Sequence, residues 1–163
     1  ALTPFASFFK HDVMWGEMDA LGHVNNTCYL RWMEEARLQY MHKAAALQGE
    51  QQDTTQAAEG QPRNNNNTNF VLASVTLHYK RPVVYPASVY VNVRTTRVGN
   101  SSFDQECVMM CMDREGQVWE AAQGHHTCVL VDSHTGKSTA LPAPFKRAVT
   151  VIDGSDSTLK ASL

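Results

Sequence analysis

The residues with the clearest chemical potential lie together in the stretch DALGHVNN, residues 19–26. An aspartate opens the stretch, and two asparagines close it directly before a long helical pattern. A carboxylate can attack a carbonyl carbon, or it can activate a water molecule for that attack. A helix N-terminus offers unpaired N–H groups and positive potential, which stabilise the oxyanion that forms. We therefore predict that Asp19 and the backbone N–H of Asn26 (or Asn25) form a catalytic pair.

The other residues of this stretch can support that pair. Gly22 can supply the backbone geometry, a positive φ or a close approach, that folds Asp19 back beside the helix. His23 can orient the carboxylate or contact substrate, and a purely structural role for it remains equally open. The side chains of Asn25 and Asn26 can hold the loop and cap the helix, and Asn25 is also a candidate substrate contact.

Two alternative sources of a catalytic group lie on the helix itself. Glu34 or Glu35 could act as a helix-borne carboxylate, but a carboxylate already precedes the helix, so we interpret both as structural. Cys28 with His23 could form a nucleophile pair. We expect the first turns of the helix to point Cys28 toward the core, which disfavours this pair.

The expected elements are one helix and a set of antiparallel strands. Apolar residues at helical spacing predict a helix over residues 26–46 with Asn25 or Asn26 as N-cap. Alternating patterns predict one strand before this helix and at least four after it, over residues 5–15, 71–79, 89–93, 103–112 and 117–131. An apolar helix followed by a meander predicts an α+β fold in which a sheet wraps around the helix. Edge strands of so small a sheet need covering, which favours dimerisation through the sheet edge.

The length and composition of the chain predict a single domain with its own hydrophobic core. The 163 residues are 43% hydrophobic and carry a net charge of -2, which argues against nucleic acid as a partner. No apolar run reaches the roughly 18 residues of a membrane span. The polar segment 48–67 predicts a mobile surface loop inserted into the domain, and residues 148–163 form a tail of undetermined structure.

The four cysteines show no CxxC spacing, which favours buried thiols in a reducing compartment. A zinc site built from Cys107, Cys111 and one of His125 or His126 is a weaker alternative, because strand alternation points these histidines to opposite faces. We therefore expect no metal and no cofactor. A glycosylation sequon at Asn25, inside the candidate site, also favours an intracellular location, the cytoplasm before an organelle.

Residues 15–37, WGEMDALGHVNNTCYLRWMEEAR, resemble the hotdog thioesterases of the 4-hydroxybenzoyl-CoA thioesterase type. The pattern is carried by Asp19, Gly22, His23, Asn25, Asn26, Tyr29, Glu34 and Arg37. Residues 75–93 also look like the second strand and turn of that family, and the resemblance extends over residues 5–131. It implies a hotdog fold, hydrolysis of acyl-CoA, and a homodimer or dimer of dimers with the active site between subunits. A non-catalytic acyl-CoA or lipid sensor remains an alternative, and a hotdog dehydratase lacks its His–Asp arrangement.

The resemblance also narrows the substrate. Plant acyl-carrier-protein thioesterases carry Asn two residues after their Asp, where this chain has Leu21, so acyl-CoA is favoured over the carrier protein. Asn26 occupies a place where aromatic-acyl enzymes tend to hold Tyr. We expect basic side chains to bind the phosphates of CoA, with Lys80 and Arg81 as the main candidates and Arg63, Lys146 and Arg147 as further ones. The acyl tunnel should run along the helix, lined by Met33, Val75 and Leu77.

Overall fold

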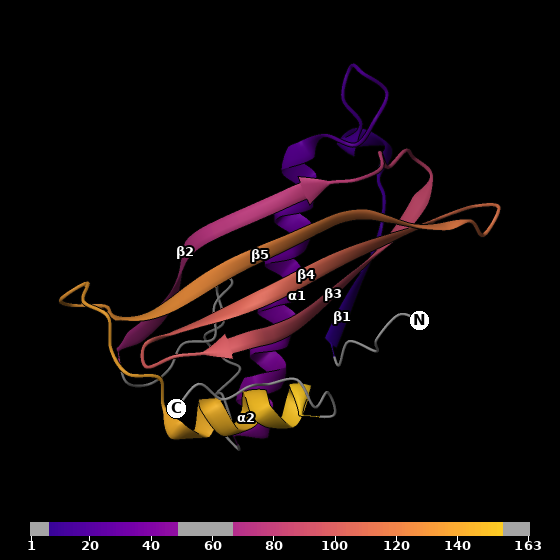
Figure 1. Cartoon of the computed structure of the whole chain (residues 1–163). Coiled ribbons are helices and arrows are strands. Elements are labelled where there is room, and N and C mark those ends of the chain that lie inside the picture. Colours follow the sequence, from indigo (N-terminus) through magenta and orange to yellow (C-terminus); the bar gives the residue numbers. More distant parts are fainter. Residues whose placement is uncertain (1–6, 49–66, 155–163) are drawn as a thin grey trace, which may run out of the picture.

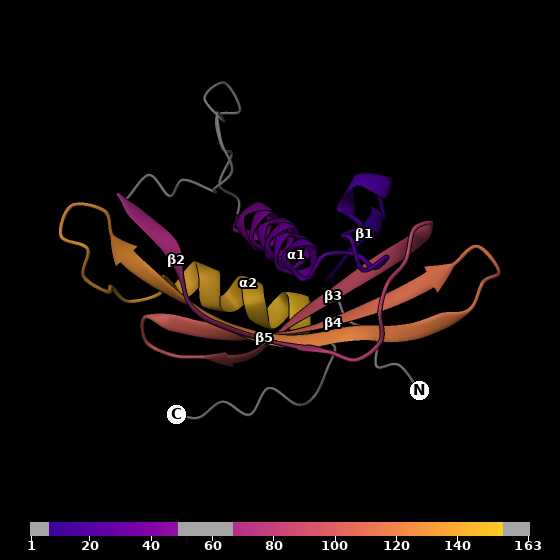
Figure 2. The same ribbon diagram turned by 90° about the horizontal axis from the view of Figure 1, so that it is seen from above.

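Five antiparallel strands form a single sheet that curves around one long helix (Figures 1 and 2). The computed structural model describes residues 7–48 and 67–154, so most of the predicted polar loop and the end of the predicted tail lie outside the described residues. The strands are β1 (Ser7–Asp12), β2 (Thr68–Tyr79), β3 (Ala87–Val98), β4 (Ser102–Asp113) and β5 (Val118–Asp132), in the spatial order β1-β3-β4-β5-β2. The predicted α+β hotdog architecture, a sheet wrapped around one long helix, is confirmed. The predicted meander is wrong for the first strand after the helix, because β2 pairs with β5 and not with β3.

Alternation of side chains along the central strands separates a buried face from a partly exposed one. On β3, Val89, Val91, Val93 and Thr95 are buried, whereas the residues between them are only half-buried. The same period of two runs along β4 and β5, as expected for strands that face a core on one side. The buried face is the concave one, against which the long helix lies (Figure 2).

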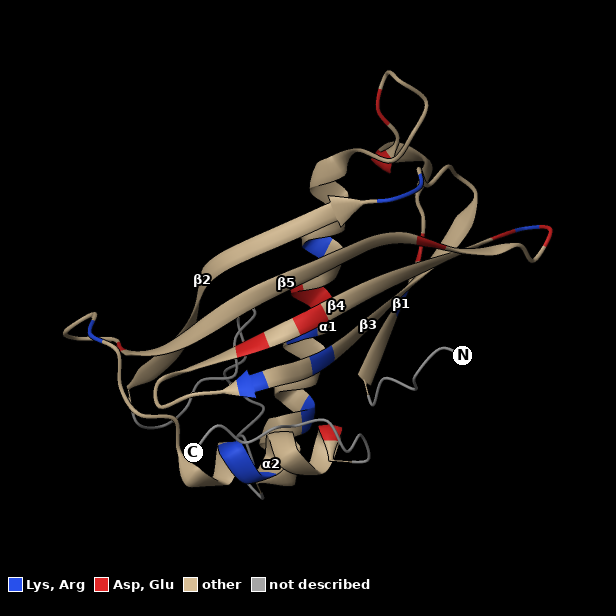
Figure 3. Cartoon of the chain, in the orientation of Figure 1, with Lys and Arg blue, Asp and Glu red and all other residues tan. Residues whose placement is uncertain are grey.

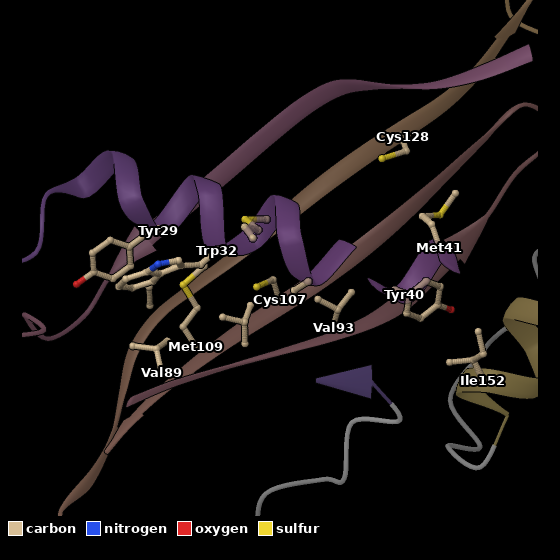
Figure 4. Packing of buried hydrophobic residues seen from close by; sticks show 14 of the residues in the cluster. Tyr29, Trp32, Tyr40, Met41, Val89, Val93, Cys107, Met109, Cys128 and Ile152 are labelled. Atoms are coloured by element: carbon tan, nitrogen blue, oxygen red, sulfur yellow. The ribbon is translucent and has the colours of Figure 1, made fainter. Parts of the chain in front are cut away.

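The helix α1 (Asn26–Leu47) begins at the predicted position and supplies the centre of the core. Its buried residues follow one face: Tyr29, Trp32, Met33, Ala36, Tyr40, Met41 and Ala44. Figure 4 shows the aromatic and methionine side chains of this face packed against valine, cysteine and methionine side chains from the strands. Burial of each large apolar side chain stabilises the fold by about 1.5–3 kcal/mol.

A second helix, α2 (Ala143–Asp153), lies in a part of the chain that gave no clear sequence signal. It packs near the C-terminal half of α1, on the same face of the sheet (Figure 1). Its Phe145 ring lies 5.1 Å from the Phe70 ring and 5.3 Å from the Phe103 ring. The helix therefore closes the apolar core at the end of α1 that is opposite the DALGHVNN loop.

Buried polar groups join α2, α1 and the sheet through hydrogen bonds. Asp153 accepts a hydrogen bond from the Tyr40 hydroxyl (2.5 Å) and one from the Thr95 amide (3.0 Å). The Thr95 hydroxyl donates to the Tyr40 oxygen, and Gln105 donates to the Thr95 hydroxyl. Burial raises the pKa of Asp153 and of Tyr40. These hydrogen bonds therefore satisfy Tyr40, Thr95 and Oδ2 of Asp153, which would destabilise the core if they had no partners, whereas Oδ1 of Asp153 has no partner among the described residues.

Burial on the inner face of the sheet affects most of the residues that were considered above as zinc ligands. His126 is buried beside Gln105, and His125 is exposed, as strand alternation predicted. Burial, with Arg37 nearby, lowers the pKa of His126 to about 4, which keeps its imidazole neutral. Burial raises the pKa of the Cys107 thiol to about 12 and that of Cys111 to about 11. Across residues 7–48 and 67–154, no group of three or more His, Cys, Asp and Glu side chains could hold a metal ion.

Substitution of Tyr40 by Phe should lower the free energy of unfolding by about 1–3 kcal/mol, because the buried Asp153 carboxylate loses a hydrogen-bond donor. Urea denaturation followed by circular dichroism measures this loss. Tyr90→Phe is the matched control, since Tyr90 lies on the other face of β3 and its hydroxyl bonds to no described residue. The control should change stability by less than about 0.5 kcal/mol. Equal losses in the two variants would contradict the role given to the network.

Candidate active site

The DALGHVNN segment forms a tight hairpin that returns the chain to the start of α1. Met18 and Val24 form an antiparallel bridge, and the Asp19 amide donates to the His23 carbonyl at 2.8 Å. Within the turn, the Gly22 amide donates to the Asp19 carbonyl at 3.0 Å. Gly22 has a φ of 77°, a left-handed conformation that favours glycine, and no atom lies within 4 Å of an added Cβ, so of the two predicted roles the structure shows the positive φ and not the close approach.

The Asp19 carboxylate has one engaged oxygen and one free oxygen. Its Oδ1 accepts a hydrogen bond from the Leu21 amide at 2.8 Å, which fixes the side chain against its own turn. Its Oδ2 has no hydrogen-bond partner in the described part of the chain, and the residue is half-buried. An anchored carboxylate with a free oxygen suits both a nucleophile and a general base.

The first turn of α1 keeps one amide available. Asn25 is the N-cap, as predicted: its Oδ1 accepts from the Thr27 amide at 3.0 Å and from the Thr27 hydroxyl at 2.7 Å. The Cys28 amide donates to the Asn25 carbonyl at 3.0 Å. The amide of Asn26, an exposed residue, has no acceptor among residues 7–48 and 67–154. The helix therefore presents a free N–H in the same segment as the Asp19 carboxylate.

Aromatic side chains from α1 and β2 adjoin this helix start. The Tyr79 hydroxyl donates to the Asn26 carbonyl at 3.2 Å, and the Tyr79 ring meets Tyr29 edge-on at 5.1 Å. Tyr79 is the last residue of β2, so this contact joins the end of an edge strand to the beginning of the helix. Three large apolar side chains, Met14, Trp15 and Leu21, are exposed near this hairpin.

The alternative catalytic groups lie in less suitable places. His23 uses its carbonyl to close the hairpin, and its exposed imidazole bonds to no residue that the structure describes. Cys28 is half-buried, and burial raises the pKa of its thiol, so the reactive thiolate is disfavoured. Glu34 and Glu35 are both exposed, and Glu34 lies 3.8 Å from Arg37.

The basic candidates divide between the two ends of the molecule. Lys80 and Arg81 directly follow Tyr79, and Figure 3 shows this basic segment at the same end as the start of α1. Lys80 binds Glu120 at 2.6 Å and Gln123 at 3.0 Å, and the Arg81 guanidinium lies 4.3 Å from the centre of the Trp119 ring. The candidates Lys146 and Arg147 belong to α2, at the opposite end of α1.

The predicted tunnel residues are partly brought together. Met33 is buried against β5 at Gly124, where an added Cβ would meet Met33 Cε at 3.1 Å and Leu77 Cδ1 at 3.0 Å. Gly124 therefore leaves the room that Met33 and Leu77 occupy. Val75, on the edge strand, is 41% exposed. The tunnel role of these residues stays a prediction.

The sequence analysis did not identify Glu17 as a candidate residue of this region. The Glu17 carboxylate lies in η1 (Trp15–Glu17) and accepts hydrogen bonds from side chains of β1 and α1. No hydrophobic period or motif marks it, because an acidic residue in a short turn is ordinary. Only the position of its donors in space distinguishes it.

Comparison with known proteins places these features in a family. Residues 13–149 match the model of the thioesterase-like superfamily. The chain belongs to this superfamily. The thioesterase-like match includes Asp19, the start of α1 and all strands from β2 to β5, and it supports thioester hydrolysis as the general activity.

Solved structures agree with the family. The chain is 27% identical to a thioesterase from Thermus thermophilus solved with coenzyme A and Zn, covering 92% of this chain and 96% of that one with a TM-score of 0.70. It is 25% identical to a thioesterase-superfamily protein from a Jannaschia species, covering 93% and 85% with a TM-score of 0.72. A 4-hydroxybenzoyl-CoA thioesterase variant complexed with 4-hydroxybenzoyl-CoA shares the fold, with 14% identity, coverage of 87% and 96%, and a TM-score of 0.71.

Among curated proteins, the uncharacterized protein YsmA of Bacillus subtilis is 30% identical over 100 residues. The match covers 61% of this chain and 58% of that relative. None of the helices within residues 7–48 and 67–154 has the length and hydropathy needed to cross a membrane.

Substitution of Gly22 by Ala should destabilise the protein by about 1–2 kcal/mol, because alanine resists a positive φ. It should also lower the rate of thioester hydrolysis about tenfold or more, since the turn holds Asp19. Gly116→Ala is the matched control: Gly116 has a φ of 80° in the β4–β5 turn, and neither glycine has an atom within 4 Å of an added Cβ. The control should lose the same stability and keep its activity. Equal activity in the two variants would show that the hairpin does not position the site.

Proposed function

We propose that the protein hydrolyses acyl-CoA to a free carboxylic acid and CoA, with Asp19 as nucleophile or general base. The observation that carries this proposal is that the segment from Asp19 to the start of α1 holds both a carboxylate oxygen, on Asp19, and a backbone N–H, on Asn26, without partners among the described residues. Membership of the thioesterase-like superfamily supports it. So do the coenzyme A in the Thermus structure and the acyl-CoA bound to the 4-hydroxybenzoyl-CoA thioesterase variant.

In the proposed reaction the Asn26 amide donates to the thioester carbonyl oxygen and stabilises the negative charge that develops there. Asp19 either attacks the carbonyl carbon or removes a proton from a water molecule that attacks it. In the first case the tetrahedral intermediate expels CoA thiolate and leaves a mixed anhydride between Asp19 and the acyl group, which water then hydrolyses to restore the carboxylate. In the second case the tetrahedral intermediate expels the thiolate directly. Thiolate is a good enough leaving group that neither route needs a strong general acid.

Acyl-CoA is preferred to an acyl carrier protein for two reasons. Leu21 stands where the carrier-protein enzymes have Asn, and its side chain is 81% exposed beside the catalytic turn. Lys80 and Arg81 extend from the end of β2 nearest the helix start, where the phosphates of CoA could reach them. Lys80 would have to exchange its partner Glu120 for a phosphate.

We also propose that the protein forms a homodimer, or a dimer of dimers, through the edge strand β2, with each active site near the subunit interface. This strand is exposed along nearly its whole length, and it carries Val71, Leu72, Val75 and Tyr79 as large exposed apolar residues. An uncovered apolar edge of twelve residues is a natural site for strand pairing. Tyr79 on the same strand contacts Asn26, so a partner on β2 would lie beside the proposed site.

Replacement of Asp19 by Asn should lower kcat/KM for acyl-CoA by about two orders of magnitude or more, because the amide is neither nucleophile nor base. Thiol release measures the rate over acyl-CoAs of differing chain length and aromaticity. Asp12→Asn is the matched control, since Asp12 is an exposed carboxylate on β1 bound to Lys10 and Ser88. Full activity in Asp19→Asn would overturn the assignment. Saturable binding without turnover in the unaltered protein would instead identify an acyl-CoA sensor.

Leu72→Glu should shift the protein toward the monomer, because a carboxylate on β2 would be buried in the proposed interface. Sedimentation equilibrium measures the mass as a function of concentration. Val151→Glu is the control, since Val151 is 67% exposed and lies on α2, not on the edge strand β2. An unchanged mass in Leu72→Glu would place the interface, if one forms, on another surface.

A further inference from the structure

The Glu17 carboxylate holds three parts of the chain together under the catalytic hairpin. His11 Nε2 on β1 lies 2.9 Å from its Oε2 and 3.0 Å from its Oε1. The Met14 amide donates to Oε2 at 2.7 Å, and the Trp32 indole Nε1 on α1 donates to Oε1 at 3.1 Å. A carboxylate has about four acceptor positions, so Glu17 can satisfy all of these partners at once.

The backbone of the same residue connects to both halves of the proposed site. The Glu17 carbonyl accepts the Asn25 amide at 2.8 Å, and Asn25 directly precedes the free amide of Asn26. In the other direction, the chain runs from Glu17 through Met18 to Asp19. Glu17 is therefore joined to the hairpin that carries the carboxylate through the chain, and to the helix turn that carries the free N–H through the hydrogen bond from Asn25.

We propose that Glu17 is a positioning residue that fixes the Asp19 carboxylate relative to the Asn26 amide. The inference rests on the proposed function, because it gives the alignment of these two groups a catalytic purpose. Glu17 itself lies behind the hairpin, its side chain only 20% exposed. It acts on the reaction through the residues that it holds.

The charge of Glu17 is what makes it suited to this task. Burial alone raises the pKa of this carboxyl, but the hydrogen bonds from His11 and from the Met14 amide together lower it below its usual value. The group is therefore an ionised acceptor, and its hydrogen bonds are of the stronger, charge-assisted kind. Glutamine has the same shape but only one oxygen, and its NH₂ group cannot accept a hydrogen bond from the Met14 amide or from the Trp32 indole.

Small displacements matter in such a site. A misplacement of about 1 Å between reacting groups can cost around a hundredfold in rate. If Glu17 positions the pair, its loss should reduce kcat, because the chemistry requires the alignment. It should leave substrate affinity nearly unchanged, because the hydrogen-bond partners of its side chain do not include Lys80 or Arg81, the side chains proposed to bind CoA.

The experiment compares Glu17→Gln with Tyr40→Phe in the full chain. We expect Glu17→Gln to lower kcat about tenfold or more, with KM and the Kd of a non-hydrolysable thioether analogue of acyl-CoA changed less than about threefold. Tyr40→Phe loses a buried hydrogen bond at the far end of α1, and it should lose stability without loss of kcat. Trp32→Phe removes one of the donors to Glu17 and keeps an aromatic ring, so it should give a smaller loss of kcat.

A double variant tests whether Glu17 works through Asp19. In an Asp19→Asn background the pair no longer exists, so Glu17→Gln should lower the residual rate by a much smaller factor than in the unaltered protein. The proposal is overturned if Glu17→Gln keeps kcat within about twofold, or if its effect is the same in both backgrounds. If Glu17→Gln does not fold, Trp32→Phe with an unaltered kcat overturns it equally. Full activity in Asp19→Asn would instead refute the proposed function, which separates the two failures.

Discussion

Burial of one face of α1 on the concave side of the sheet is the constraint on which the rest of the structure depends. Aromatic and methionine side chains on this face fill the space between the helix and the strands, so the helix can neither slide nor rotate without opening voids (Figure 4). The position of its first turn is thereby fixed beside the end of β2 and the segment that follows it. There the Val24 amide donates to the Val83 carbonyl, which joins the DALGHVNN hairpin to that segment.

The conformation of the DALGHVNN hairpin, which carries the proposed active site, depends on this fixed helix start. Asn25 caps the helix, Gly22 turns the chain, and Glu17 ties the base of the hairpin to β1 and α1. Every hydrogen bond of the hairpin restricts where the Asp19 carboxylate and the Asn26 amide can lie. Donors that are already oriented need no reorganisation when charge develops on a substrate oxygen, which is the main physical advantage of such a site.

The two ends of α1 have different roles. At the C-terminal end, Tyr40 and Asp153 lie in a buried network that holds α2 in place, and the Phe145 ring of α2 packs against Phe70 and Phe103. At the N-terminal end, backbone groups and a carboxylate remain free for a substrate. The separation explains why stability and activity should respond to different substitutions, although both depend on the same helix.

By itself, the sequence determined the α+β class, the start of α1 at Asn26 and the strand pattern, because side-chain periodicity and capping are local properties. It also singled out Asp19 and the positive φ of Gly22, since a turn beside a helix leaves a recognisable local pattern. Helix α2 and the contacts of Glu17 were decided only by the tertiary structure. Their partners lie far apart along the chain, as Trp32 and His11 do for Glu17, and no local pattern reports which distant donors will converge on one carboxylate.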